Sequence, residues 1–219
     1  MSTHALFGGS FDPIHNGHLH IAREIVKSGC VDSVVFLPNS RHNFKKGSVL
    51  LDFANRFELV KSALGHGMEV WDDDSTGSGY TSDLLQRIYE KYPDHSFYWV
   101  IGSDNLASLH AWHDYAWLTT FVRFLVIPRP GFPLELDLLR KIRRKVLQIK
   151  PSPVSSTQVR ERIAEGKPLK GLVPHALENR IIELYKPLLA KRGKSVAKPL
   201  APAKKTFPWD LDHPEKKRG

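Results

Sequence analysis

Short apolar runs alternate with longer amphipathic stretches along most of the chain. The runs predict strands at 5–7, 34–37, 69–71, 97–101, 124–127 and 146–149. Apolar residues at helical spacing predict helices at 18–27, 51–64, 82–89 and 136–144, and two more beginning near Ser156 and Pro174. Such alternation is typical of βαβ units, whose parallel sheet is covered by helices on both faces. The sequence therefore predicts an α/β fold that binds ligands beyond the carboxyl ends of its strands.

Two of the predicted helices carry a clear apolar face. In 18–27 the face consists of Leu19, Ala22, Ile25 and Val26. In 51–64 it consists of Phe53, Phe57, Val60 and Leu64. These faces should pack against the sheet.

Composition narrows the class of protein. With 219 residues, 41% of them hydrophobic, the chain is long enough to bury a sizeable core. A single cysteine, Cys30, excludes a disulfide framework and a Cys-based zinc finger. No run of apolar residues reaches the roughly 18 needed for a membrane helix, and the first residues lack the pattern of a secretory signal. We expect a cytoplasmic protein with no membrane contact.

The positive charge is concentrated at one end of the chain. Of the net +9, residues 191–219 contribute +6 through nine Lys or Arg and three Asp or Glu. This Lys/Pro-rich segment has no apolar period, which predicts a domain at 1–190 followed by a flexible basic tail at 191–219. The tail could instead be an anionic tether or a docking peptide anchored by the Phe-Pro-Trp at 207–209. Nucleic acid is the less favoured partner, since the body itself carries only +3.

The sequence GGSFDPIHNGH at 8–18 follows the first predicted strand and enters the first helix. Gly8 and Gly9 leave backbone N–H groups open to a ligand, and a helix start favours phosphate. His15 and His18 can point the same way and donate hydrogen bonds to a phosphate in a transition state. The alternatives are a packed turn or half of a zinc site with His110 and His113, but zinc ligand spacing is otherwise missing.

A second candidate phosphate site begins a late helix. The run Ser155-Ser156-Thr157 precedes Arg160 by less than one helical turn. A capped helix explains the serines, but hydroxyls, free N–H groups and an arginine at a helix start also suit an anion. From these residues alone, both interpretations remain open.

The segment at 8–18 resembles the signature of the nucleotidyltransferase superfamily, which includes nicotinate-nucleotide, pantetheine-phosphate and glycerol-phosphate nucleotidyltransferases. It is also similar to the HIGH motif of class I aminoacyl-tRNA synthetases. The run at 155–160 resembles the second superfamily motif. This resemblance implies a Rossmann-like doubly wound parallel sheet with a helical C-terminal part, and attack on the α-phosphate of a nucleoside triphosphate.

Four further segments resemble the nicotinate-nucleotide adenylyltransferase branch. They are YTSD at 80–83, IGSD at 101–104 with Leu106 and Trp112 beyond it, PRPG at 128–131, and LVP at 172–174. With the two phosphate motifs, the resemblance extends from residue 5 to about residue 189. Other interpretations exist for some residues: Thr81 and Asp104 also suit helix caps, and a tryptophan such as Trp112 is common in a core.

The resemblance implies a role for each matching residue. As catalytic residues it indicates His15, His18 and Lys45. For ATP binding it indicates Gly8, Gly9, Ser10, Phe11, His15, His18, Gly102, Asp104, Ser155, Ser156, Thr157 and Arg160. For mononucleotide binding it indicates Asp12, Lys45, Thr81, Trp112 and Arg129.

One segment departs from the bacterial family. Where a Pro-Pro-His-Lys-like stretch is usual, residues 38–46 read PNSRHNFKK. Lys45 matches the basic residue, but Phe44 stands in place of His and the paired prolines are missing. Lys46 and His42 are alternatives to Lys45, and a solvated basic loop would also explain the segment.

We therefore expect ATP with Mg²⁺ to donate an adenylyl group to nicotinate mononucleotide in NAD biosynthesis, with Mg²⁺ on phosphate oxygens and no dedicated metal ligands in the protein. The alternatives are the same chemistry on nicotinamide mononucleotide or another phosphate acceptor, or a nucleic-acid-binding module that uses the basic tail. The sequence leaves open whether the chain forms a homo-oligomer.

Overall fold

The computed structural model describes residues 1–40 and 49–195. In this part of the chain six strands form one sheet in the order β3-β2-β1-β4-β5-β6, and every neighbouring pair is parallel. The strands are β1 (Thr3–Gly9), β2 (Ser33–Pro38), β3 (Met68–Val70), β4 (Ser96–Gly102), β5 (Arg123–Ile127) and β6 (Arg143–Val146). This is the strand order of a doubly wound sheet, so the predicted fold class is confirmed.

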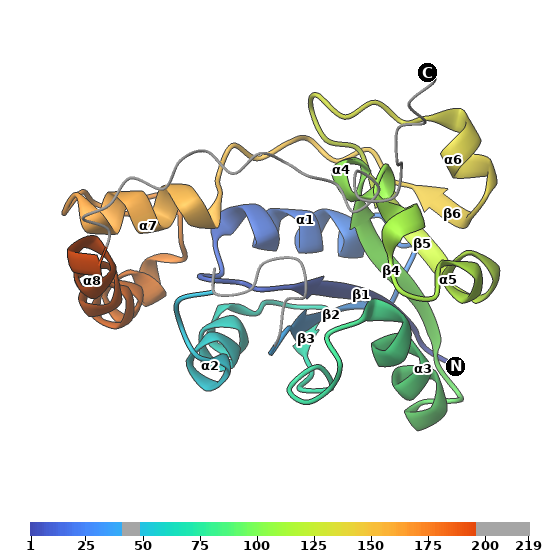
Figure 1. Ribbon diagram of the computed structural model, residues 1–219, viewed down its shortest axis with the longest axis horizontal. Coiled ribbons are helices and arrows are strands. Elements are labelled where there is room, and N and C mark those ends of the chain that lie inside the picture. Colours follow the sequence, from blue (N-terminus) through green and yellow to red (C-terminus); the bar gives the residue numbers. More distant parts are fainter. Residues whose placement is uncertain (41–48, 196–219) are drawn as a thin grey trace, which may run out of the picture.

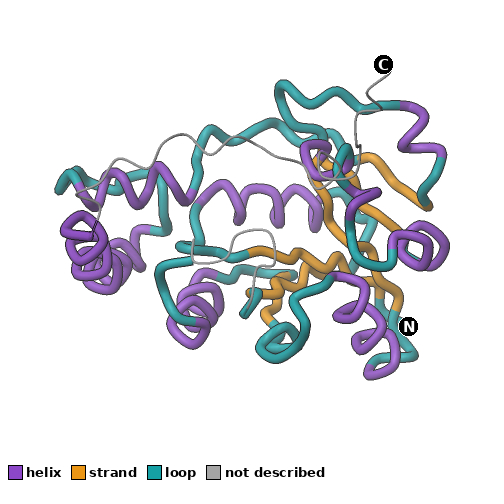
Figure 2. The backbone as a smooth tube through the Cα atoms, viewed as in Figure 1, coloured by secondary structure: helices purple, strands orange, loops and turns teal. Residues whose placement is uncertain are grey.

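Helices connect the strands and cover both faces of the sheet (Figures 1 and 2). The α-helices are α1 (Asn16–Lys27), α2 (Phe53–Ala63), α3 (Thr81–Lys91), α4 (Ser103–Leu106), α5 (Tyr115–Phe121), α6 (Leu136–Arg140), α7 (Ser156–Ala164) and α8 (Glu178–Ser195). Two short 3₁₀ helices are η1 (Leu109–Ala111) and η2 (His175–Leu177). The last two α-helices lie together at the left of Figure 1, beyond the end of β1. They form the helical C-terminal part that the sequence predicts.

The strands have two buried faces because their side chains alternate between two cores. In β2, Val34 and Phe36 join a core that includes residues of α1, α2, α7 and α8. Val35 and Leu37 of the same strand join a second core with residues of α3 to α6. Leu19, Ala22 and Ile25 of α1 are buried in the first core, as the predicted face requires.

Two predicted elements differ from the structure, and one observed helix was not predicted. The helix predicted at 136–144 ends at Arg140, and the last strand is Arg143–Val146 rather than 146–149. The strand begins earlier than predicted because residues 143–146 pair with β5, where Arg143 lies opposite Arg123. Helix α5 was not predicted; Asp114 caps its start by accepting from the N–H of Trp117.

The buried face of α2 is also rotated from the predicted one. Arg56, Leu59 and Val60 are buried, whereas Phe53 and Phe57 are only half-buried. At the chain's end, α8 continues to Ser195, five residues past the boundary predicted at 190. The remainder of the predicted tail lies outside the described residues, as does Lys45. Within the described part, no helix combines the length and apolar character needed to cross a membrane.

The chain places β2 and β3 on one side of β1 and then places β4, β5 and β6 on the other side. The strand order therefore reverses between β1 and β4, which are neighbours in the sheet. β1 ends at Gly9 and β4 ends at Gly102, so the carboxyl ends of these strands meet at one edge. Ligands of doubly wound sheets bind in the crevice at such a point. The segments at 8–18 and 101–104 therefore lie where the fold favours a site.

Candidate functional site

The turn between β1 and α1 fixes the ring of His15. His15 is the N-cap of α1, and its Nδ1 accepts hydrogen bonds from the backbone N–H groups of Gly17 at 3.1 Å and His18 at 3.3 Å. Because Nδ1 is an acceptor, the proton of the neutral ring is on Nε2. The helix start thus sets both the orientation and the tautomer of His15.

The second histidine stacks on the first. The ring centroids of His15 and His18 are 3.6 Å apart with an interplanar angle of 22°. Burial, and then the positive charge of Arg129, lower the pKa of His15 to about 4. Burial, His15 and Arg129 hold the pKa of His18 well below its ordinary value. Both imidazoles are therefore neutral near pH 7 and can act as N–H donors without carrying charge.

One nitrogen of this histidine pair has no hydrogen-bond partner in the part of the chain that the structure describes. Within the described residues, Nδ1 of His18 is buried and makes no hydrogen bond. The ring of His18 also packs edge-on against Phe11, whose centroid lies 5.0 Å away. Buried polar atoms without partners are uncommon in folded proteins, so this nitrogen is a candidate contact for a ligand.

Packing leaves little room for a side chain at either of the two glycines at the end of β1. A Cβ at Gly8 would overlap the ring of Trp99, and a Cβ at Gly9 would lie 3.0 Å from Cζ of Phe11. Phe11 itself is 2% exposed, so its ring belongs to the core. Its predicted contact with ATP can come only from its backbone.

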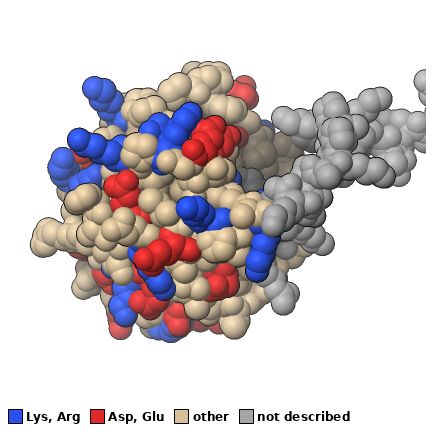
Figure 3. Space-filling model, turned by 90° about the vertical axis from the view of Figure 1, so that its left-hand side faces the viewer, with Lys and Arg blue, Asp and Glu red and all other residues tan. Residues whose placement is uncertain are grey.

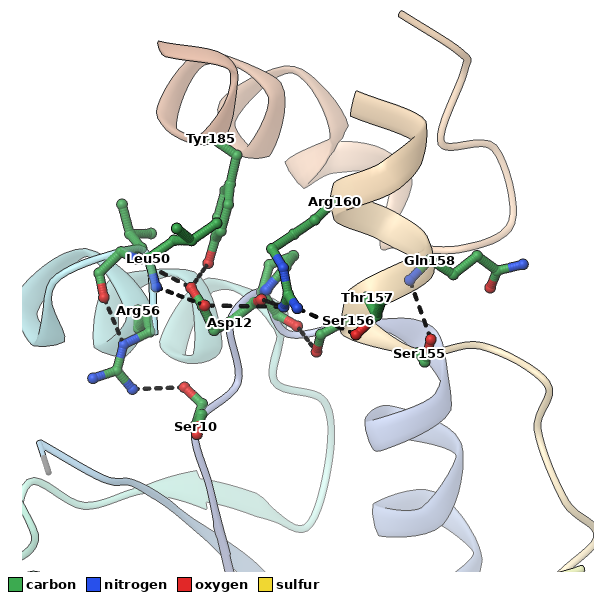
Figure 4. A network of polar contacts seen from close by, with 12 residues as sticks. Ser10, Asp12, Leu50, Arg56, Ser155, Ser156, Thr157, Gln158, Arg160 and Tyr185 are labelled. Carbon is green, nitrogen blue, oxygen red and sulfur yellow. Dashed lines mark hydrogen bonds and ion pairs between the residues drawn. The ribbon is translucent and has the colours of Figure 1, made fainter. Parts of the chain in front are cut away.

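Asp12 lies at the centre of a buried polar network (Figure 4). The side chain of Asp12 is 4% exposed. Its Oδ1 accepts from the hydroxyl of Tyr185 at 2.6 Å and from the N–H of Leu51 at 3.2 Å, and its Oδ2 accepts from the N–H of Leu50 at 2.9 Å. Asp12 thereby joins the β1–α1 loop to the approach to α2 and to the last helix.

The two predicted phosphate motifs meet in this network. Arg160 donates from Nη1 to the carbonyl of Asp12 at 2.6 Å and from Nη2 to the hydroxyl of Thr157 at 3.2 Å. The hydroxyl of Ser156 donates to the carbonyl of Pro13 at 2.9 Å. Ser155 caps α7 by accepting from the N–H of Gln158 at 3.2 Å, so the capping interpretation is confirmed for that residue. Segments 143 residues apart in sequence are thus joined at one sheet edge.

A second group of predicted residues lies at the ends of β4 and β5. Asp104 and Arg129 form an ion pair of 3.2 Å, and Oδ1 of Asp104 is buried without a partner in the described part of the chain. Ser103 orients this pair by accepting from the N–H of Arg129 at 2.9 Å and donating to the carbonyl of Phe132 at 2.8 Å. A Cβ at Gly102 would collide with the carboxylate of Asp104. The influence of Arg129 on both histidine pKa values links this group to the first motif.

Thr81 and Trp112 belong to neighbouring segments. Thr81 is the first residue of α3, and the Tyr80 ring before it stacks on His113 with centroids 4.3 Å apart. His113 also hydrogen-bonds the hydroxyl of Ser82 through Nδ1 at 3.0 Å. Trp112 is partly buried against the second core. The structure therefore places these two predicted contacts on adjoining segments.

The LVP segment at 172–174 docks onto the first motif. Asn16 donates from its backbone to the carbonyl of Leu172 at 2.8 Å and from Nδ2 to the carbonyl of Val173 at 3.1 Å. His110 and His113, the alternative zinc residues, are not part of a metal-binding group; among residues 1–40 and 49–195 no three His, Cys, Asp or Glu side chains form one.

Two residues of the site were missed from the sequence. Arg56 of α2 is 1% exposed and donates to the carbonyl of Ser10 beneath the first motif. Tyr185 is fully buried and donates to Asp12. Arg56 precedes Val60 by four residues and so lies on the same face of the helix. A cation on an apolar helix face was the sequence signal that could have indicated Arg56. For Tyr185 no comparable signal exists, because it reads as an ordinary core residue.

Comparisons with known proteins identify the family of this chain. A family model described as cytidylyltransferase-like matches residues 6–162. A protein of Clostridium tetani named "probable nicotinate-nucleotide adenylyltransferase" is 32% identical over 84% of this chain and 98% of its own length. The nicotinate-nucleotide adenylyltransferase of Bacillus subtilis is 29% identical over 84% of this chain and 97% of its own.

Solved structures share the fold. The Plasmodium falciparum nicotinic acid mononucleotide adenylyltransferase complexed with NaAD has a TM-score of 0.72 at 21% identity, covering 84% of this chain and 96% of that one. The same Plasmodium enzyme complexed with APC gives a TM-score of 0.71. From the sequence matches, the chain belongs to the cytidylyltransferase-like family and, within it, to the nicotinate-nucleotide adenylyltransferases.

Proposed function

We propose that this enzyme transfers the adenylyl group of ATP to nicotinate mononucleotide, giving nicotinate adenine dinucleotide and pyrophosphate in NAD biosynthesis. Family membership supports the reaction. The structural observation that carries it is the junction of two phosphate motifs at the switch point of the sheet, through Arg160 to Asp12 and Ser156 to Pro13.

In this reaction a phosphate oxygen of the mononucleotide forms a bond to the α-phosphorus of ATP. The bond from that phosphorus to the α–β bridging oxygen breaks, and its electron pair leaves with pyrophosphate. A phosphate monoester is already a competent nucleophile, so the enzyme must mainly position the reactants and stabilise charge. Preorganised N–H donors serve that purpose.

We assign the histidines to the α-phosphate. Nε2–H of His15, fixed by its capping role, and the N–H of His18 would donate to phosphate oxygens as charge develops. Neutral imidazoles suit this role because each keeps an N–H near pH 7. Lys45, outside the described residues, remains our proposal for an added positive charge.

The remaining proposed contacts follow the geometry of the site. Thr157 and Arg160 would hold the β- and γ-phosphates, since a guanidinium has five N–H donors and two of them are used internally. Asp104 would accept a hydrogen bond from ATP, since its Oδ1 has no partner among the described residues. Thr81, Trp112 and Arg129 would receive the mononucleotide.

For Asp12 we propose a positioning role in place of the predicted contact with the mononucleotide. Both carboxylate oxygens already accept internal hydrogen bonds, and the side chain is buried. Asp12 would act by holding the loop that carries His15.

ATP enters as its magnesium complex in our proposal. Mg²⁺ prefers oxygen ligands and commonly bridges the phosphates of bound nucleotides. It would offset the charge of the leaving pyrophosphate.

The test is pyrophosphate release by the purified full-length protein with ATP and Mg²⁺, comparing nicotinate mononucleotide with nicotinamide mononucleotide. We expect a strong preference for the nicotinate form. Equal or reversed rates would support adenylyl transfer but overturn the assignment of nicotinate mononucleotide as the preferred acceptor. The segments around Thr81 and Trp112 would then need to be re-examined. No release with either acceptor would overturn the proposal.

A further inference from the structure

Arg56 is a buried cation that contacts three separate segments at the carboxyl edge of the sheet. Its Nε donates to the carbonyl of Leu51 at 2.9 Å, its Nη1 to that of Ser10 at 2.6 Å, and its Nη2 to that of Asn39 at 2.7 Å. Figure 4 shows the guanidinium reaching from α2 to Ser10. Each of its three nitrogens thus holds a different piece of backbone.

Among the residues that the structure describes, this cation has no close acidic partner. Within the described part of the chain, no carboxylate lies within ion-pair distance of Arg56, and Asp12, Asp52 and Asp74 act on it only from farther away. A buried, unpaired charge is costly, so a chain that needed only a well-packed α2 would be expected to use an apolar residue here. The cost suggests that the three hydrogen bonds serve the site.

The three carbonyls belong to segments that must stay in register. Ser10 follows β1 and Asn39 follows β2, which is its neighbour in the sheet, while Leu51 precedes α2. Phe11, directly after Ser10, has a φ of 45°, a left-handed conformation that non-glycine residues seldom adopt. Such a backbone persists where its surroundings hold it firmly.

A neighbouring contact reinforces this arrangement. Arg56 donates to the carbonyl of Leu51, while Asp12 accepts from the N–H of the same residue. The guanidinium and the Asp12 network therefore fix the same backbone from opposite sides, one from α2 and the other from the loop that leads to His15.

We propose that Arg56 is a positioning residue for adenylyl transfer: its three-way contact holds the phosphate-binding turn after β1 in register with the ends of β2 and the start of α2. This inference rests on the proposed site, and it goes beyond the proposed reaction by assigning the turn's geometry to a residue that touches no substrate. Only an arginine presents three nitrogens in one rigid plane; lysine keeps the charge but offers a single nitrogen.

The test compares Arg56→Lys with a matched core variant, Val122→Ala. Val122 is fully buried in the second core and directly precedes β5, so its truncation destabilises the fold at the amino ends of the strands, away from the proposed site. Turnover is measured per folded molecule, at a temperature well below both unfolding midpoints. We expect Arg56→Lys to lower kcat at least tenfold while KM for ATP changes less than threefold, and Val122→Ala to keep kcat within twofold of the wild type.

Chemical rescue distinguishes a role for the several N–H donors of the Arg56 guanidinium from a role for its positive charge alone. In Arg56→Gly, millimolar guanidinium should restore at least part of the lost kcat, whereas methylammonium at the same concentration should not. Equal rescue by both compounds would overturn the role of the planar guanidinium.

Hydrogen–deuterium exchange measures how firmly the turn after β1 is held, independently of catalytic activity. In Arg56→Lys the peptides covering 8–14 and 49–52 should exchange at least tenfold faster, while α3 stays protected. Unchanged exchange in both peptides, or kcat within threefold of the wild type, would overturn the inference. Failure of the wild type itself to release pyrophosphate would count against the proposed function instead, and the exchange result would still decide the role of Arg56 in positioning.

Discussion

Two buried histidine groups lie at opposite edges of the same sheet and differ in how their polar atoms are used. At the amino edge, His4 of β1 is 6% exposed, and both ring nitrogens are engaged: Nδ1 with the hydroxyl of Ser33 at 2.8 Å and Nε2 with His95 at 2.6 Å. At the carboxyl edge, His18 keeps a buried Nδ1 without a partner in the described part of the chain.

The carboxylates show the same contrast. Glu69 at the amino edge accepts from Ser33 at 2.7 Å and from Nε1 of Trp71 at 3.1 Å, one bond to each oxygen. Asp104 at the carboxyl edge leaves one oxygen buried and without a partner in residues 1–40 and 49–195. Burial lowers the pKa of His4 as it does those of His15 and His18, so the pKa shift alone does not separate structure from function. The two edges differ instead in whether a buried polar atom is left without a hydrogen-bond partner among the described residues.

The largest expected effect is that of His18→Ala. Loss of a donor to the reacting phosphate should lower kcat about 100-fold, or about 2.7 kcal/mol of transition-state stabilisation. His20→Ala is the matched control, since His20 lies on the same helix and hydrogen-bonds the carbonyl of Lys150. It should keep kcat within twofold. Steady-state kinetics check both, and a loss of less than tenfold in His18→Ala would remove the distinction between the two edges.

His4→Ala should have the opposite profile. Removing the ring leaves a cavity and frees the polar atoms of Ser33 and His95, which should lower the free energy of unfolding by about 2 kcal/mol. Because the amino edge is remote from the reaction, kcat per folded molecule should stay within twofold. Urea unfolding and kinetics on the same preparation test this, and a tenfold fall in kcat would break the comparison.

The pH dependence of stability should carry the signature of His15. Its folded pKa of about 4 lies below the ordinary 6.5, so the unfolded chain binds more protons between these values. The stabilising contribution is complete above pH 6.5 and is lost as the pH falls toward 4, by about 2 kcal/mol between pH 7 and pH 5.

His15→Asn tests that origin, because asparagine is also a good N-cap but does not titrate. Urea unfolding at pH 7 and pH 5 should give a smaller loss of stability in this variant than in the wild type. An identical loss in both proteins would mean that other histidines with lowered pKa values, such as His18 or His4, take up the protons.

The smallest expected effects come from the two carboxylates. Asp104→Asn removes the charge beside Arg129 and should raise KM for ATP about tenfold, or about 1.4 kcal/mol. Glu69→Gln should leave KM unchanged and lower stability by about 1 kcal/mol, since an amide has one acceptor oxygen where two are used. Equal KM values in the two variants would contradict the assignment of Asp104 to ATP.

Periodicity and local motifs predicted most of the fold. Five strands lie where apolar runs predicted them, since a strand buried on both faces needs a continuous run such as Val34 to Leu37. The last strand was misplaced because Arg143, Arg144 and Lys145 do not read as a strand; their pairing with β5 is a tertiary effect. Helix α5 was missed because its apolar period extends over only seven residues.

The parts of the candidate site that the sequence could indicate are those whose residues lie close together along the chain. Each phosphate motif could be found from its own residues, but their junction through Arg160 and Asp12 spans 148 positions and could not. Arg56 and Tyr185 act through bonds to backbone or to a distant carboxylate, so no short motif contains them. Sequence thus indicates groups that can touch substrate better than those that hold them in place.

The hydrogen bond from Tyr185 to Asp12 has a consequence for synthesis of the protein. The two residues are 173 positions apart, so the ribosome makes the first motif long before its last support. Until α8 has emerged and packed, Oδ1 of Asp12 lacks its shortest bond and the turn carrying His15 stays unsupported on that side. The candidate site at the carboxyl edge of the sheet therefore gains this support only after α8 has been made and has packed.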